Sequence, residues 1–376
     1  MQIKSPTFLR SLTQTLVLPL LSVVTAVLVG SLFMLLNGYN PLAAYAGMLD
    51  GAFGSPTSVA RTLLSAIPLL FSGLSVAFAF KGGLFNIGGE GQLFLGAVAS
   101  AWVGVAFAGL PGVIHMTLAV LAGFIAGALW GGISGALKAY TGAHEVITTI
   151  MLNNLAIILA GWLVSQGGEG QTPGPLRDPD PLNIVPRTAQ VAESARLPVL
   201  FKLGSESINF GLILAILAIL IIWWLVWRST FGFELRMVGL NPSAGKYAGV
   251  NVKRTTITTM AIAGGLAALA GAIETLGRNY YFAPNFNTGY GFDGIAVALL
   301  GKSHPLGVGL SAVLFGAMDA GTTRMQLAAR VPSEIIQIVQ ALVLVFIAAP
   351  EIIRFIYRMR LEKEERAALS AGWGQR

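Results

Sequence analysis

The sequence contains no cysteine, which excludes disulfide bonds, thiolate metal sites and cysteine nucleophiles. It also contains little charge: 11% of its 376 residues are charged, whereas a soluble domain carries about 25%. A chain with so few charges cannot cover a water-exposed surface. Because 55% of its residues are hydrophobic, the lipid bilayer must be its main solvent.

Patterns typical of enzymes and metal sites are also missing. The three histidines, His115, His144 and His304, form no metal-ligand cluster, and no Gly-x-Ser-x-Gly motif occurs. A near match to a phosphate-binding loop at 296–303 has apolar residues between its ends and follows a membrane segment. We therefore expect no enzymatic activity, no metal and no cofactor. The net charge of +7 lies mostly in short loops and the C-terminal tail, as topology signals do, so we expect no nucleic-acid partner.

Long hydrophobic runs, in contrast, are abundant. A helix needs about 20 apolar residues to cross the hydrocarbon of a bilayer. A shorter run at 292–301 follows a Gly/Asn/Tyr-rich stretch and predicts a half-helix. The long runs are 16–36, 61–80, 91–110, 113–137, 146–166, 209–227, 255–277, 305–322 and 332–352. The sequence predicts an all-α integral membrane protein of about ten transmembrane helices.

The positions of the basic residues predict the topology. Sixteen of the 24 lysines and arginines fall on the side of the N-terminus, which the positive-inside rule assigns to the cytosol. Both termini are then cytosolic. The polar, Pro-rich residues 167–208 form an external loop, 228–254 the largest cytosolic loop and 353–376 a cytosolic tail. We interpret 1–376 as a single transmembrane domain with its core at 60–352.

Two patterns concern helix packing. The segments 61–166 and 255–352 each contain a Gly-rich break before an apolar run, at 86–92 and 287–293, and the charge count places the first break towards the cytosol and the second towards the outside. This predicts inverted repeats with interrupted helices along a pathway. Glycines at 123, 127, 131 and 135 mark one helix face, which serves either packing within the chain or a subunit interface.

Several polar residues in apolar surroundings are candidates for a solute pathway. Asn86, Glu90 and Gln92 lie at the first break, where the carboxylate either has a functional role or caps a helix in water. Asn153 and Asn154 are adjacent amides inside an apolar helix, so they bond to neighbouring helices or line the path. Asp293 is the last residue of the second break.

The cytosolic loop contains a predicted helix start. Asn241 and Pro242 suit the N-cap and first position of a helix. A short surface helix of small residues either docks a partner or is an ordinary solvated loop.

Five stretches together resemble the permeases of bacterial ABC importers, in the nucleoside and simple-sugar branch of the ribose and branched-chain amino-acid permease superfamily. They are FNIGGEGQ at 85–92, EVITTIMLN at 145–153, RMVGLNPSA at 236–244, KYAGV at 246–250 and FDGIAVALLG at 292–301. The resemblance covers about 60–352. The chain departs from it at Gly245-Lys246, where Ala-Arg is common, and at Asn154, where an aromatic is common.

The resemblance implies a transport subunit without its own ATPase, in a bacterial inner membrane. Its partners would be a cytosolic ATP-binding subunit, an extracytoplasmic solute-binding protein and a second permease, either a shorter paralogue or another copy. The solute would be a nucleoside, or next a simple sugar. An ion-coupled secondary transporter is the alternative. The residues expected to couple to the ATPase are Glu234, Arg236, Gly239, Asn241, Pro242, Lys246 and Tyr247; those expected along the solute path are Asn86, Glu90, Gln92, Asn153 and Asp293.

Overall fold

The computed structural model describes residues 7–167, 172–180, 182–284, 289–348, 352–353 and 356–357. The chain forms two compact units, one of residues 1–41 with 331–376 and one of residues 42–330. The single-domain interpretation stays a prediction. Most of the predicted tail, together with positions 287 and 288 of the second break, lies outside the described residues.

The first unit pairs the two ends of the chain. Helix α1 (Thr7–Leu36) packs against α13 (Ser333–Ala348), so the first and last predicted runs are both helical. The Ser22 hydroxyl donates to the Phe346 carbonyl at 3.2 Å, and the hydroxyls of Thr25 and Tyr357 lie 3.1 Å apart. The first contact joins the two helices directly, and the second joins α1 to a residue beyond the end of α13.

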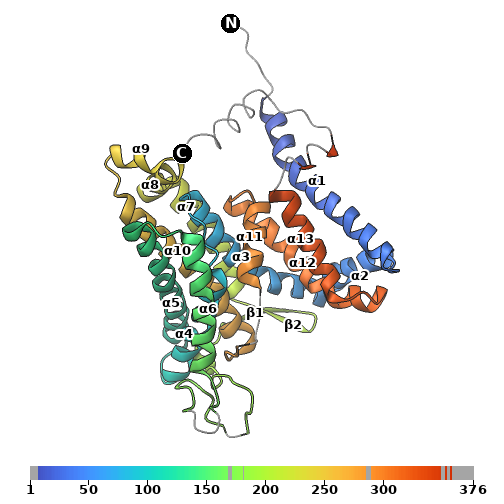
Figure 1. Cartoon of the computed structure of the whole chain (residues 1–376). Helices are drawn as coiled ribbons and strands as arrows, with labels where there is room; N and C mark the ends of the chain where they lie inside the picture. The colour runs from blue at the N-terminus through green and yellow to red at the C-terminus, as the bar shows by residue number, and fades with distance from the viewer. Residues whose placement is uncertain are drawn as a thin grey trace. The chain divides into compact units, whose positions relative to one another are not determined.

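The larger unit is a helix bundle with one small hairpin (Figure 1). Its longer helices are α3 (Pro56–Lys81), α4 (Gly89–Ala106), α5 (Gly112–Thr141), α6 (Glu145–Leu163), α7 (Gly211–Arg228), α10 (Val252–Glu274) and α12 (Pro305–Ala329). Its shorter helices are α2 (Pro41–Phe53), α8 (Thr230–Leu240), α9 (Pro242–Tyr247) and α11 (Tyr290–Leu300). A π-helical turn, Thr275–Asn279, extends α10.

Within the described residues, six helices are long and apolar enough to cross a membrane: α3, α5, α6, α7, α10 with its π turn, and α12. Shorter apolar helices at 20–36 and 290–300 add to them. This agrees with the predicted all-α membrane fold, and α11 is the expected half-helix of 11 residues. Sequence reasoning missed α2, which contacts α12 closely: the Asp50 carboxylate lies 3.4 Å from the Arg324 guanidinium.

The predicted external loop is more ordered than a plain loop. It contains a one-turn 3₁₀ helix, Glu193–Ala195, and an antiparallel hairpin of β1 (Val199–Leu203) and β2 (Glu206–Asn209). The Leu197 amide donates to the carbonyl of Leu276 at 3.0 Å, and the Val191 amide donates to that of Tyr280 at 2.8 Å. Backbone hydrogen bonds thus attach this loop to the segment that follows α10.

Helix α10 lies at the centre of the unit, against α3, α4 and α5. The four glycines of α5 face it: a Cβ at Gly127 would collide with the Gly264 carbonyl, and one at Gly135 would lie 2.9 Å from the Met260 Cβ. Small residues allow helices to approach at backbone distance. The glycine stripe therefore serves packing within the chain, the first of the two interpretations.

The contact pattern supports an internal repeat. In the first segment α3 is followed by α4 and α5, and in the second α10 is followed by α11 and α12. Helix α3 packs against α11 and α12, while α10 packs against α4 and α5. The first helix of each segment thus packs against the second and third helices of the other segment. Two related halves that interlock are expected to show this pattern.

Candidate functional site

The two Gly-rich breaks of the sequence meet inside the bundle. The Glu90 carboxylate accepts hydrogen bonds from the backbone amides of Gly289 and Gly291, at 2.8 and 2.7 Å. These amides lie at the N-terminus of α11, where a helix has unsatisfied N–H groups and a partial positive charge. Glu90 is 4% exposed. It caps a helix, but a buried one from the other half of the chain, not its own helix in water.

At this junction the backbone of the second break lies so close to that of the first that no side chain fits between them. A Cβ at Gly291 would collide with the backbone of Glu90. Gly289 has a φ of +110°, a conformation that residues with side chains rarely adopt, and it turns the chain into α11. Glycine is therefore required here by the contact between the two breaks.

Asn86 and Gln92 form a reciprocal amide pair beside Glu90. The Asn86 Nδ2 donates to the Gln92 Oε1 at 2.8 Å, and the Gln92 Nε2 donates to the Asn86 Oδ1 at 3.0 Å. Asn86 also donates to the Ser75 hydroxyl of α3 at 3.0 Å. Both amides are 1% exposed. Because buried polar groups need such partners, this pair fixes the shape of the break.

Asn153 attaches α6 to the same break. Its Oδ1 accepts from the Gly91 amide at 2.7 Å, and its Nδ2 donates to the Ile87 carbonyl at 2.8 Å. Asn154, the next residue of α6, is exposed. Of the two alternatives for Asn153, bonding to a neighbouring segment is the one observed.

Four of the five residues predicted along the solute path thus use their polar atoms inside this chain. Asp293, the fifth, lies half-buried in the first turn of α11, and its carboxylate makes no hydrogen bond or ion pair with any residue that the structure describes.

Sequence reasoning missed a charged group next to Asp293. The Arg278 guanidinium of the π turn lies 3.1 Å from the carboxylate of Glu274, which is buried. The charge of Asp319 on α12 acts electrostatically on both of them and on Asp293. The signal was available, because Glu274 and Asp319 fall inside predicted membrane runs, where ionisable residues are costly and usually functional.

The position of Asp319 on α12 separates it from the lipid-facing side. Leu306 and Leu310 are exposed and apolar, as a lipid-facing surface requires. Asp319 is also exposed but lies two and a half turns from Leu310, on the opposite side of the helix at about 3.6 residues per turn. An exposed carboxylate there needs water or a partner.

The second group of predicted residues forms a pair of short helices, α8 and α9, at the end of the bundle opposite the loop that follows α6 (Figure 1). Asn241 is the N-cap of α9, as predicted: its Oδ1 accepts from the amides of Ser243 and Ala244, at 3.0 and 3.1 Å. Pro242 occupies the first helical position. Ser229 caps α8 by accepting from the Gly232 amide at 2.9 Å.

Helix α8 is fastened to the bundle through one side. Leu235 and Val238 are buried, and a Cβ on Gly239 would collide with the carbonyl of Lys81 at the end of α3. In return, a Cβ on Gly83 would lie 2.8 Å from the Gly239 carbonyl. Because Gly239 and Gly83 have no side chains, α8 can lie directly against the turn that leads into the first break.

Helix α9, in contrast, projects its side chains outward. Tyr247 is 94% exposed, and Asn241, Pro242 and Lys246 are exposed as well. On α8, Glu234 and Arg236 are half-buried, and the Arg236 Nε donates to the Gly232 carbonyl at 3.2 Å. An exposed tyrosine on a short, well-capped helix is suited to binding another protein.

A smaller cluster lies at the same end of α3. The rings of Trp227 and His304 have centroids 5.0 Å apart, and the Lys81 ammonium lies 5.7 Å from the Trp227 ring centroid. His304 precedes α12, and burial together with the nearby charge of Lys81 lowers its pKa. Both causes favour the neutral imidazole over the charged one.

Comparison with known proteins identifies the family to which the chain belongs. Residues 58–348 match the family described as the permease component of branched-chain amino acid transport systems. The chain belongs to this family. The permease is 42% identical to the guanosine ABC transporter permease protein NupP of Bacillus subtilis, over 91% of this chain and 95% of that protein.

Two further relatives are similar over most of their length. The permease is 36% identical to the nucleoside ABC transporter permease protein NupB of Lactococcus lactis, covering 93% of this chain and 94% of that protein. It is 33% identical to the glucose ABC transporter permease protein TsgB13 of Haloferax volcanii, covering 89% and 87%. No solved structure matches the chain. The permease is thus a multi-pass membrane subunit of an ABC importer.

Proposed function

We propose that the permease imports nucleosides. The observation that carries this proposal is the similarity to NupP, a guanosine permease, which covers 95% of that protein at 42% identity. Simple sugars are the second candidate, because TsgB13, a glucose permease, is 33% identical over 87% of its length. Both solute classes are neutral and rich in hydroxyl groups.

Helix α9 is the element that couples the permease to its ATP-binding subunit. Its exposed residues Asn241, Pro242, Lys246 and Tyr247 form the contact surface, while Glu234, Arg236 and Gly239 of α8 connect it to the bundle. Two features support this role: Asn241 caps the start of α9, and α8 packs on the turn after α3. Movement of α9 would therefore be transmitted to the segment that contains Asn86 and Glu90.

The solute path passes the face of α11 and α12 that carries Asp293 and Asp319. Four bonded residues shape this path from behind: Glu90 joins the two breaks, while Asn86, Gln92 and Asn153 hold the first break in shape. The supporting observation is that the carboxylate of Asp293 has no partner among the described residues, whereas the polar atoms of the other four are bonded. Carboxylates accept from the N–H and O–H donors of a nucleoside.

The complete importer contains further subunits. A second permease, a shorter paralogue of this chain, covers the exposed polar face of α12, and an extracytoplasmic solute-binding protein docks at the end that carries the β1–β2 hairpin. The α8–α9 end and both termini face the cytosol of a bacterium, as the distribution of basic residues indicates.

Uptake into proteoliposomes tests this function. The permease is reconstituted with the products of its neighbouring ATP-binding, permease and binding-protein genes, and uptake of labelled guanosine is measured with and without internal ATP. We expect ATP-dependent uptake that unlabelled nucleosides compete and glucose does not. Competition by glucose alone would favour the sugar. Uptake without ATP, driven by an ion gradient, would contradict the ABC mechanism.

A further inference from the structure

A pocket of about 270 Å³ opens between the end of α5 and the start of α10. Its walls come from the last turn of α5 and from the cap and first two turns of α10. The lining residues are Tyr140, Asn251, Lys253, Arg254, Ile257 and Thr258. None of them was assigned a role in the coupling helix or in the solute path.

The positive charge of this pocket is not balanced. Lys253 and Arg254 lie in the first turn of a 23-residue helix, where the aligned peptide dipoles already produce a partial positive charge. The first turn of α10 contains no acidic residue, and neither side chain forms an ion pair within the described part of the chain. Two exposed cations at the positive end of a helix repel each other and the helix, so an anion would stabilise the site.

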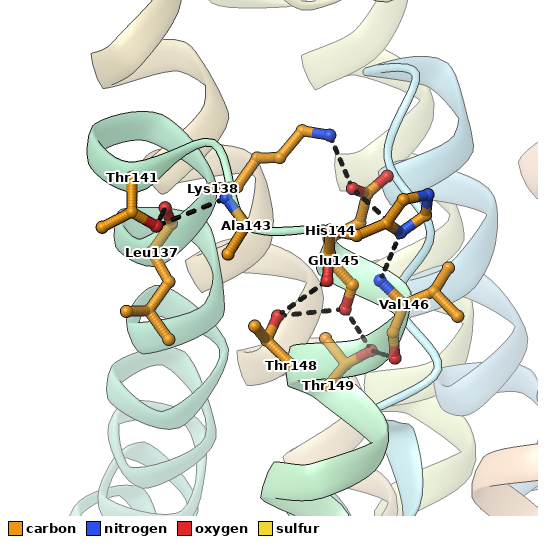
Figure 2. Close-up of polar contacts among 9 residues, drawn as sticks. All are labelled: Leu137, Lys138, Thr141, Ala143, His144, Glu145, Val146, Thr148 and Thr149. Atoms are coloured by element: carbon orange, nitrogen blue, oxygen red, sulfur yellow. Dashed lines mark hydrogen bonds and ion pairs between the residues drawn. The ribbon is translucent and has the colours of Figure 1, made fainter.

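The neighbouring lysine on α5 shows the contrast. The Lys138 ammonium lies 2.7 Å from the carboxylate of Glu145, which is buried at the start of α6 (Figure 2). Lys253, in contrast, has its ammonium 4.9 Å from the centroid of the Tyr140 ring. A cation–π contact holds the side chain at the pocket but leaves its charge unneutralised.

An exposed apolar surface begins at the pocket and continues along the membrane. Leu129, Ile133 and Leu137 of α5 are exposed and precede Tyr140 at intervals of four, four and three residues. At about 3.6 residues per turn, all four side chains lie on one face. Ile257 of α10 lines the pocket on its apolar side. A ligand with an anionic head and an apolar tail therefore complements the whole surface.

We propose that this pocket binds the phosphate headgroup of an anionic phospholipid, with an acyl chain lying along the exposed face of α5. Basic pockets between membrane helices at the cytosolic side are suited to such headgroups. The proposed function enters only in assigning the headgroup to the cytosolic leaflet. The site also adjoins the coupling segment, because Asn251 caps α10 only four residues after α9 ends.

Native mass spectrometry of the purified, delipidated permease, titrated with phosphatidylglycerol or phosphatidylcholine, tests this site. We expect the wild type to retain phosphatidylglycerol and not phosphatidylcholine. The variant Lys253→Gln/Arg254→Gln should bind phosphatidylglycerol about 30-fold more weakly, given the usual contribution of two basic residues near an anionic surface. The matched control Lys202→Gln/Arg228→Gln removes the same charge from exposed positions elsewhere and should bind within twofold of the wild type.

Three results would overturn the proposal: equal binding of both lipids to the wild type, unchanged phosphatidylglycerol binding in the Lys253→Gln/Arg254→Gln variant, or an equal loss in the control. If that variant does not fold, Lys253→Arg/Arg254→Lys replaces it, since it keeps the charge and should keep the lipid binding. The preference of the wild type for phosphatidylglycerol over phosphatidylcholine then decides whether the proposal stands.

Two further arms identify the ligand. Inorganic phosphate that displaced all phosphatidylglycerol at equal concentration would indicate a free-anion site instead of a lipid site. Loss of the lipid on adding the ATP-binding subunit would indicate that this subunit occupies the pocket. Because the assay contains neither solute nor ATP, its outcome is independent of whether the permease transports nucleosides.

Discussion

The junction of the two Gly-rich breaks and the α8–α9 helix pair differ in where their polar groups are satisfied. At the junction, Glu90, Asn86 and Asn153 bond to backbone or side chains of this chain and are buried. On α9, the Asn241 Oδ1 accepts two hydrogen bonds from the same short helix, and Tyr247 is 94% exposed. The junction is therefore held together by bonds within this chain, whereas α9 leaves most of its side chains exposed.

The largest expected effect on stability is at the closest backbone contact of the junction. Gly291→Ala places a Cβ against the backbone of Glu90, where nothing can give way easily, so we expect a cost of about 3 kcal/mol or more. We expect a strongly lowered thermal midpoint and loss of transport. The matched control is Gly245→Ala in α9, where a Cβ would lie 3.3 Å from a side-chain methyl group of Val238 and no backbone atom of another residue would be closer than 3.8 Å. Equal thermal midpoints for the two variants would remove the distinction between the regions.

The next effect is at the carboxylate that caps α11. Glu90→Ala leaves the buried amide of Gly291 and the half-buried amide of Gly289 without an acceptor, so we expect a loss of about 2–3 kcal/mol. Asp293→Asn is the control, because the Asp293 carboxylate lies near the same helix start but makes no such bonds. This variant should leave the thermal midpoint nearly unchanged and should slow solute uptake. A Glu90→Ala protein of wild-type stability would show that Glu90 is not a structural cap.

A smaller effect is expected at the cap of α9. Asn241→Ala removes the acceptor for two amides and should cost about 1 kcal/mol locally. Because α9 is exposed, the thermal midpoint of the permease should fall little, while binding of the ATP-binding subunit weakens. Asn241→Asp keeps a capping oxygen and should retain more binding than the alanine variant. Co-purification of the ATP-binding subunit at equal yield with all three proteins would argue against a docking role for α9.

The smallest effect on the permease itself is expected at Tyr247. Tyr247→Ala removes an exposed ring, so its thermal midpoint should match the wild type. The same change should weaken binding of the ATP-binding subunit at least about tenfold, because a tyrosine buried at an interface often contributes more than 1.4 kcal/mol. Surface plasmon resonance with the purified ATP-binding subunit measures the affinity of the wild type and of the Tyr247→Ala variant. If Tyr247→Ala lowered the thermal midpoint but left binding of the ATP-binding subunit unchanged, Tyr247 would be a residue of the fold and not of the docking surface.

The sequence predicted features that depend on local chemistry or on hydrophobic length. The half-helix α11, the N-cap at Asn241 and the glycine stripe of α5 are of this kind. The packing of the stripe within the chain became clear only from Gly264 and Met260 of α10, which are distant in sequence.

Features that depend on long-range contacts were not predicted. The charge count placed the two breaks towards opposite sides, but nothing in it indicated that Glu90 would reach the amides of Gly289 and Gly291. The group around Arg278 and Asp319 was missed because each charge, taken alone, lies near a helix end or in an isolated position. Only the fold brings α10, α11 and α12 together.

The most direct test of the account uses the absence of cysteine from the chain. Single-cysteine variants Ser243→Cys on α9 and Lys202→Cys on β1 can be cross-linked to the ATP-binding subunit with no background from the permease. The account predicts rapid cross-linking at position 243, altered by ATP, and none at position 202. Absence of cross-linking at 243, or equal cross-linking at both positions, would contradict the assignment of α9 as the coupling helix.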